Sequence, residues 1–105
     1  MIVMNKNKES NITELFNEAL KNHKEGNFYI AKKIYIKILR QDSKFINAHQ
    51  NLGILFGLEG ENIKAKECYE KVIEINPNVI IAQYNLGLIL NRLKNFIEAK
   101  KCLKK

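Results

Sequence analysis

The sequence contains no tryptophan, one proline, five glycines and two cysteines in 105 residues. So little proline and glycine excludes collagen-like and Pro/Gly-rich low-complexity chains. The two cysteines, Cys68 and Cys102, exclude a disulfide-rich framework and a zinc site built from four thiolates. We expect both cysteines to be packing residues.

Long apolar runs are also lacking. Lys6 and Lys8 follow the apolar Met1–Met4 at once, so the opening does not have the apolar core of a secretory signal. No later stretch approaches the length of a membrane span. We therefore predict a cytoplasmic protein without a membrane partner.

The remaining composition favours a folded, largely helical chain, with 46% hydrophobic and 28% charged residues. The net charge of +7 raises the possibility of a nucleic-acid partner. The basic C-terminal segment, residues 100–105, has no interleaved aromatic residues, which favours a solvated helix face instead. A nucleic acid is not the expected partner, and a basic nucleic-acid-binding module stays as one alternative.

The chain repeats itself at a fixed interval. Asn51-Leu52-Gly53 recurs as Asn85-Leu86-Gly87, and Ala65 recurs as Ala99 after the same shift. Shifted backwards by that interval, Gly60 and Tyr69 fall on Gly26 and Tyr35. Three copies follow from these matches, at residues 12–45, 46–79 and 80–105.

Each copy predicts two amphipathic helices, because its apolar residues recur at helical spacing. Gly26 and Gly60 interrupt the pattern between the two helices of the first and second copies, and Asp42-Ser43 is expected to end the second helix of the first copy. The third copy stops early, so its second helix is predicted to be truncated. The predicted fold is an all-α superhelix, or solenoid, of three repeats at 12–105, preceded by a flexible segment at 1–11.

This pattern resembles the tetratricopeptide repeat, whose period of about 34 residues matches the interval between the copies. The second copy carries the resemblance best, with Leu52 and Gly53 early, Ala65 midway, Tyr69 after it and Pro77 near the end. The resemblance implies a protein-binding scaffold whose concave groove is lined by the first helix of each repeat.

Carried over by repeat position, the groove has one asparagine from each copy: Asn17, Asn51 and Asn85. An amide can both donate to and accept from a peptide backbone, so the column resembles the asparagine ladder of O-GlcNAc transferase-like arrays. The predicted apolar flanks of this ladder are Phe16, Leu20, Ile54, Tyr84 and Leu88. The carboxylate clamp of chaperone-binding members is not expected, because Phe16, Leu20 and Ile81 occupy clamp positions and only one asparagine of the clamp is retained.

Catalytic residues are scarce. His23 and His49 stand at non-equivalent repeat positions, so a structural or surface role is the better interpretation of each. No phosphate loop or metal-ligand spacing is present. We predict a protein that is not an enzyme and has no cofactor and no metal.

The predicted function is therefore a peptide- or protein-binding scaffold. An alternative is the N-terminal interaction segment of a longer protein with a glycosyltransferase- or methyltransferase-like part. Phe96, Ile97, Ala99 and Leu103 have no following repeat to cover them. This predicts a homo-oligomer formed through the C-terminal helix, or a covering segment downstream.

Overall fold

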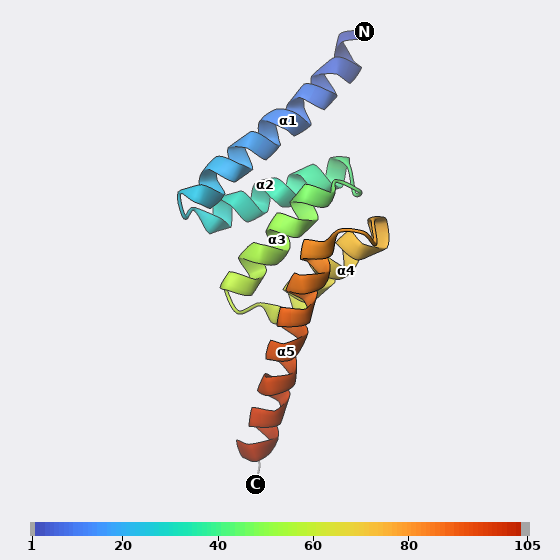
Figure 1. Ribbon diagram of the computed structural model, residues 1–105. Coiled ribbons are helices and arrows are strands. Elements are labelled where there is room, and N and C mark those ends of the chain that lie inside the picture. Colours follow the sequence, from blue (N-terminus) through green and yellow to red (C-terminus); the bar gives the residue numbers. More distant parts are fainter. Residues whose placement is uncertain (1, 104–105) are drawn as a thin grey trace. The chain divides into compact units, whose positions relative to one another are not determined.

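The computed structural model describes the backbone of residues 2–103 and the side chains of residues 11–101. Over these residues the structure consists of α-helices joined by short turns, which confirms the predicted all-α repeat fold (Figure 1). The helices are α1 (Ile2–Lys24), α2 (Phe28–Gln41), α3 (Ile46–Leu58), α4 (Asn62–Ile75) and α5 (Ile80–Leu103). Two compact units, Met1–Ala48 and His49–Lys105, divide the chain, and each is described by itself. None of the described helices is both long enough and apolar enough to cross a bilayer.

The turns inside the first two repeats form at glycines, as predicted. Gly26 has φ +84° and Gly60 has φ +79°. These values lie in the left-handed region, where the backbone of any residue with a Cβ is strained. The two glycines occupy the same position in successive repeats, so the same turn is made twice.

The third repeat departs from the first two at the equivalent position. Lys94 stands where Gly26 and Gly60 stand, and α5 continues through it without interruption to Leu103 (Figure 1). Lysine has a Cβ, so a left-handed turn at this position costs about 1–2 kcal/mol, whereas lysine is a good helix former. The separate second helix that we predicted for the truncated third repeat is therefore wrong: its residues extend the first helix instead.

The first helix begins ahead of the predicted repeat boundary. The backbone of α1 is helical from Ile2, and the flexibility predicted for residues 1–11 stays a prediction. No proline or glycine occurs in residues 2–11 to interrupt the helix. The repeat boundary at residue 12 is thus not marked by a helix end.

The second helices of the first two repeats end in the same way. The N–H of Asp42 donates to Ile38 O and the N–H of Asn76 donates to Val72 O, both at 2.8 Å. The side-chain oxygens of Asp42 and Asn76 then accept the N–H two residues on, at 3.1 and 3.0 Å. This local turn ends both helices, and it confirms the stop expected at Asp42-Ser43 without a proline.

In the first unit, α1 packs against α2. Ala19 on α1 and Ala31 on α2 are completely buried, and such small side chains allow helices to approach closely. Tyr35 is also completely buried, and its hydroxyl is hydrogen-bonded to Nδ1 of His23 at 3.2 Å. His23 therefore has a structural role in this unit.

In the second unit, α4 packs against α5. Ala65, Tyr69 and Ile89 form its buried core cluster, and partly buried apolar residues surround them: Ile54, Phe56, Leu86 and Leu93. The Tyr69 ring lies directly against the backbone of Gly53 in α3. The glycine that the repeat pattern singled out is thus a site of close approach between α3 and α4.

Candidate functional site

A hollow of about 150 Å³ lies in the second unit, and residues that the family resemblance predicts for the groove are among its lining. Three of the predicted groove residues, Ile54, Asn85 and Leu88, line it together. The other lining residues are Gly57, Leu58, Tyr69, Ile89 and Arg92. Most of these contribute apolar surface, and Asn85 and Arg92 contribute amide and guanidinium donors.

Arg92 is held at this hollow by the end of α3. Its Nη1 donates a hydrogen bond of 3.3 Å to the carbonyl oxygen of Gly57, which also accepts the N–H of Gly60 at 3.2 Å. The last carbonyls of a helix lack partners within the helix, so a guanidinium is a favourable neighbour there. Arg92 is otherwise exposed, so the remaining donors of its guanidinium are accessible to a ligand.

Gly57 lies in α3 where the helix borders the hollow, next to Ile89 and Arg92. A Cβ at Gly57 would lie 3.5 Å from Cδ1 of Ile89 and 3.7 Å from Nη1 of Arg92, which is ordinary van der Waals contact. Glycine therefore leaves the α3 backbone accessible at the hollow. Any side chain longer than alanine would project into the space that Ile89 and Arg92 border.

The asparagine column has different surroundings in its three members. Asn85 is partly buried at the hollow, Asn51 is partly buried on α3, and Asn17 is exposed on α1. Asn51 and Asn85 belong to the second unit and Asn17 to the first. The ladder of three therefore stays a prediction, whereas the placement of Asn85 beside apolar groove residues is observed.

The predicted apolar flanks also fall into two groups. Tyr84 and Leu88 on α5 are exposed, at 65% and 43% of their surfaces, and are accessible to a partner. Phe16 and Leu20 on α1 are only partly exposed. The Phe16 ring centroid lies 6.1 Å from that of Tyr35 and 5.3 Å from that of Phe45, so Phe16 also belongs to the packing of its unit.

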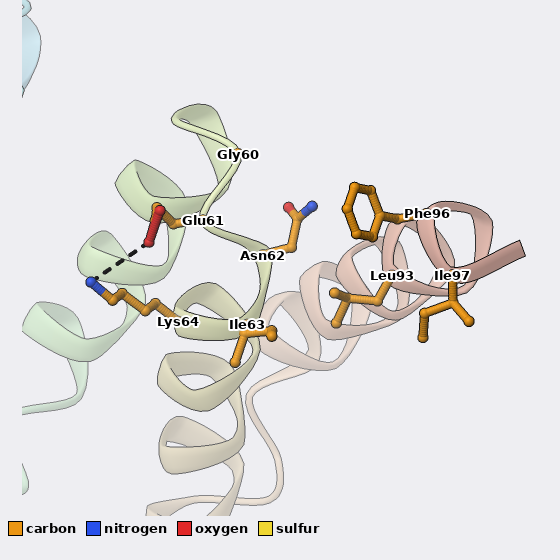
Figure 2. A pocket seen from close by; sticks show the side chains of 8 residues that line it. All are labelled: Gly60, Glu61, Asn62, Ile63, Lys64, Leu93, Phe96 and Ile97. Atoms are coloured by element: carbon orange, nitrogen blue, oxygen red, sulfur yellow. Dashed lines mark ion pairs between the residues drawn. The ribbon is translucent and has the colours of Figure 1, made fainter. Parts of the chain in front are cut away.

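A second, larger hollow of about 460 Å³ lies between the start of α4 and the distal half of α5 (Figure 2). Leu93, Phe96 and Ile97 line it from α5, and Ile63 lines it from α4. At its edge Lys64 Nζ pairs with Glu61 Oε2 at 3.6 Å. The sequence analysis identified Phe96 and Ile97 as uncovered but did not identify Ile63 and Leu93, because it expected a separate second helix in the third repeat.

Two titratable groups of α4 have pKa values raised by burial. Burial, with a smaller effect from Glu67, raises the pKa of Cys68 to about 11, so its thiol is protonated at neutral pH. Burial also raises the pKa of Tyr69 to about 12. Within the described residues, no three His, Cys, Asp or Glu side chains cluster as metal ligands would.

Two family models of the tetratricopeptide repeat match the chain. One matches residues 46–79 and the other matches residues 68–101, so together they span 46–101, more than half of the sequence. The matches overlap the second unit, including both hollows. No curated protein sequence matches the chain significantly.

Solved structures with the same repeat superpose well on this chain. The C-terminal TPR-containing domain of an FK506-binding protein of Plasmodium falciparum is 29% identical, with a TM-score of 0.80 over 96% of this chain and 65% of that one. The MamA protein is 26% identical, with a TM-score of 0.76 over 89% of this chain and 51% of that one. The first TPR of Spaghetti (RPAP3), solved with the HSP90 peptide SRMEEVD, is 22% identical, with a TM-score of 0.75 over 79% of this chain and 66% of that one.

The chain thus spans between about half and two thirds of the length of these three structures. The likeness to the RPAP3 structure concerns the fold alone, whereas the family models match the repeat sequence itself. The glycine turn at Gly60 and the packing glycine Gly53 lie within the residues that the first model matches. This chain belongs to the tetratricopeptide repeat family.

Proposed function

We propose that this chain is a non-catalytic scaffold that binds an extended peptide along the groove positions of its repeats. The observation that carries the proposal is the hollow in the second unit, where Ile54 and Leu88 stand beside Asn85 and Arg92. Apolar surface with a few oriented polar groups is the composition of peptide-binding surfaces in general.

The polar groups at the hollow favour a particular kind of contact. The amide of Asn85 can pair with one backbone N–H or C=O of an extended segment without selecting its side chains. Ile54 and Leu88 provide a place for one apolar side chain of that segment. A peptide with alternating apolar residues would use both the amide of Asn85 and the apolar surface of Ile54 and Leu88.

Charge narrows the ligand further. By resemblance to the family, the groove positions of the first repeat are Thr13, Phe16, Asn17, Leu20, His23 and Lys24, and the later repeats contribute the equivalent residues. None of these residues in the three repeats is Asp or Glu, whereas Lys24 and Arg92 are among them. The whole chain has a net charge of +7. We infer that the preferred peptide carries acidic side chains next to its apolar anchors.

The acidic HSP90 peptide SRMEEVD, which the RPAP3 structure contains, is a useful comparison ligand. Phe16, Leu20 and Ile81 stand at positions where the clamp for such a tail uses polar or basic side chains. Recognition of a terminal carboxylate by that clamp is therefore not expected. Binding that depends on internal residues of the ligand is expected instead.

The test begins with a peptide selected on the wild-type protein from a random peptide library. The triple variant Asn17→Ala, Asn51→Ala and Asn85→Ala is expected to bind this peptide at least about tenfold more weakly, since each lost amide pair contributes about 0.5–1.5 kcal/mol. Fluorescence anisotropy measures the affinity, and circular dichroism verifies that helicity is retained.

A matched control replaces three exposed asparagines outside the groove positions, Asn11, Asn78 and Asn95, with alanine. This variant should keep the wild-type affinity. Equal affinities for both triple variants would refute the asparagine mechanism. If a single-stranded oligonucleotide bound with a steep salt dependence, while no peptide could be selected, the basic nucleic-acid alternative would replace the scaffold.

A further inference from the structure

The third repeat exposes a face that the second repeat covers. In the second repeat, a Cβ on Gly53 would lie 2.7 Å from the ring of Tyr69 in α4. Gly87 stands at the same position one repeat later, and a Cβ there would meet nothing within 4 Å. The surface of α5 around Gly87 is therefore open where its counterpart on α3 is packed.

Neighbouring positions show the same contrast. Phe56 packs against the core cluster of the second unit, whereas its counterpart Leu90 is 45% exposed. Ala65 is completely buried, whereas its counterpart Ala99 is exposed. Both sides of a helix contact are thus present in the third repeat, and neither side is covered.

The straight path of α5 separates these two sides. The counterpart of Tyr69 is Leu103, which would have to reach Gly87 to repeat the contact of the second repeat. Sixteen residues of uninterrupted helix place positions 87 and 103 about 24 Å apart along the axis. Residues 96–103 therefore cannot cover residues 83–90 of the same helix while α5 is straight.

We propose that residues 96–103 of a second copy of this chain cover that face, so that two α5 helices exchange their distal halves. The segment is suited to this face by its sequence, since Ile97 and Ala99 repeat Ile63 and Ala65 of α4. Leu103 of one copy then lies at Gly87 of the other. The pair is antiparallel and symmetric, with its two-fold axis near residue 95, midway between 87 and 103.

The larger hollow lies at this axis. Phe96 and Ile97 are 60% and 53% exposed, and Ile63 on α4 is 63% exposed (Figure 2). In the symmetric pair, these apolar side chains of both copies converge around residue 95. Their burial contributes stabilisation in proportion to the apolar area removed from water.

The positive charge of each copy opposes dimer formation, and this gives the dimer a characteristic salt dependence. Each copy has a net charge of +7, and Lys94, Lys100 and Lys101 lie on or beside the exchanged segment. Salt screens this repulsion. The dimer is therefore expected to tighten as the salt concentration rises, which is the opposite of what binding to an acidic ligand or a nucleic acid would show.

Disulfide trapping tests the exchange directly. Cys68→Ser and Cys102→Ser give a chain without native thiols, to which Gly87→Cys and Leu103→Cys are added singly and together. Equal amounts of the two single variants are mixed, oxidised and separated on a non-reducing gel. A covalent heterodimer is expected, because positions 87 and 103 are the equivalents of Gly53 and Tyr69, which face each other across the contact of α3 with α4.

The other results would overturn the exchange. An oxidised double variant that stays monomeric, with its two cysteines bonded to each other, would show that the segment folds back onto its own helix. Absence of any disulfide in the mixture and in the double variant would show that something else covers the face. A control pair, Glu70→Cys with Leu103→Cys, should remain unlinked, because Glu70 lies on α4 outside this face.

Position 94 gives a second measurement that leaves the packing surfaces intact. Lys94→Gly restores the residue that makes the turn in the first two repeats. It should raise the dimer dissociation constant about tenfold, because a free monomer can then make the turn, whereas both copies in the dimer must keep the continuous helix. Lys94→Ala keeps the helix and should leave the dimer at least as stable. Sedimentation velocity over a concentration series distinguishes these outcomes, and a monomeric wild-type chain at all concentrations and salt levels would refute the proposal.

Discussion

A Cβ built on Gly53 would lie 2.7 Å from Cε1 of the Tyr69 ring, which is shorter than the van der Waals contacts that Cβ atoms make. Tyr69 is 3% exposed and packs with Ala65 and Ile89, so its ring has little room to withdraw. The contact between α3 and α4 therefore depends on the absence of a side chain at this position.

Gly53→Ala is expected to lower the free energy of unfolding by about 1–2 kcal/mol. Overpacking of a core costs about 1–3 kcal/mol, and the higher helix propensity of alanine offsets up to about 1 kcal/mol of it. Gly87→Ala is the matched control, because its Cβ meets nothing within 4 Å, and it should raise stability by up to about 1 kcal/mol. Urea unfolding at low protein concentration, where the chain is monomeric, measures both; a Gly53→Ala variant as stable as Gly87→Ala would contradict the close approach.

His23 makes the stability of the first unit sensitive to pH. Burial lowers the pKa of His23 below its ordinary 6.5, so the folded state binds a proton less readily than the unfolded state. Stability from this group is therefore present above about pH 6.5 and is lost as the pH falls through 6.5 towards the folded value. Urea midpoints measured between pH 5.5 and 8 should fall on the acid side.

The control for this pH dependence is His23→Gln, which removes the titrating group. The variant should show flatter urea midpoints over the same pH range, with a lower midpoint at pH 8 because the hydrogen bond to Tyr35 is changed. A wild-type chain whose midpoint rises on acidification would show that the folded state favours the charged imidazole.

Cys68 is expected to react slowly with thiol reagents. Its pKa of about 11, against the ordinary 9.0, means about a hundredfold less thiolate at pH 8. In a Cys102→Ser background, iodoacetamide should modify Cys68 much more slowly in the folded chain than in urea. Equal rates in the two conditions would indicate that the thiol is exposed.

Arg92 is expected to contribute to peptide affinity through charge. Arg92→Ala should weaken the binding of an acidic peptide about two- to fivefold, the range for an exposed ion pair, and should reduce the salt dependence of binding. Arg40→Ala removes an exposed cation from α2, outside the groove positions, and should leave the affinity unchanged. If both variants bind equally well, the guanidinium at the hollow has no part in recognition.

The local features of this fold follow from sequence because they depend on residue type at fixed spacing. Gly26 and Gly60 adopt positive φ because a left-handed residue is needed there, and Asp42 and Asn76 end two helices with the same local hydrogen bond. The repeat period predicts all of these positions. The groove positions of Ile54, Asn85 and Leu88 are implied by the resemblance to the tetratricopeptide repeat, and these residues do line one hollow.

Other features could not be predicted in this way because they depend on which of two local preferences prevails. The apolar pattern of residues 96–103 favours a separate second helix. Position 94, however, has a lysine in place of the turn glycine, and because lysine is a good helix former it favours the continuation of α5. The continuous α5 leaves Ile63, Leu93 and Phe96 around one hollow, which a turn at Lys94 would have altered. The double role of Phe16, partly exposed yet packed on Tyr35 and Phe45, likewise required the packed unit.

The sequence by itself determined the repeat, its family and the turns at Gly26 and Gly60, since such a turn depends on the conformational range of glycine. Only the tertiary structure decided that Gly53 is covered and Gly87 is open, although the two have similar neighbours in sequence, Leu before and an aliphatic residue after. The physical reason is that burial depends on whether another helix arrives at that face. In this chain one turn, made at Gly60 and not made at Lys94, decides it.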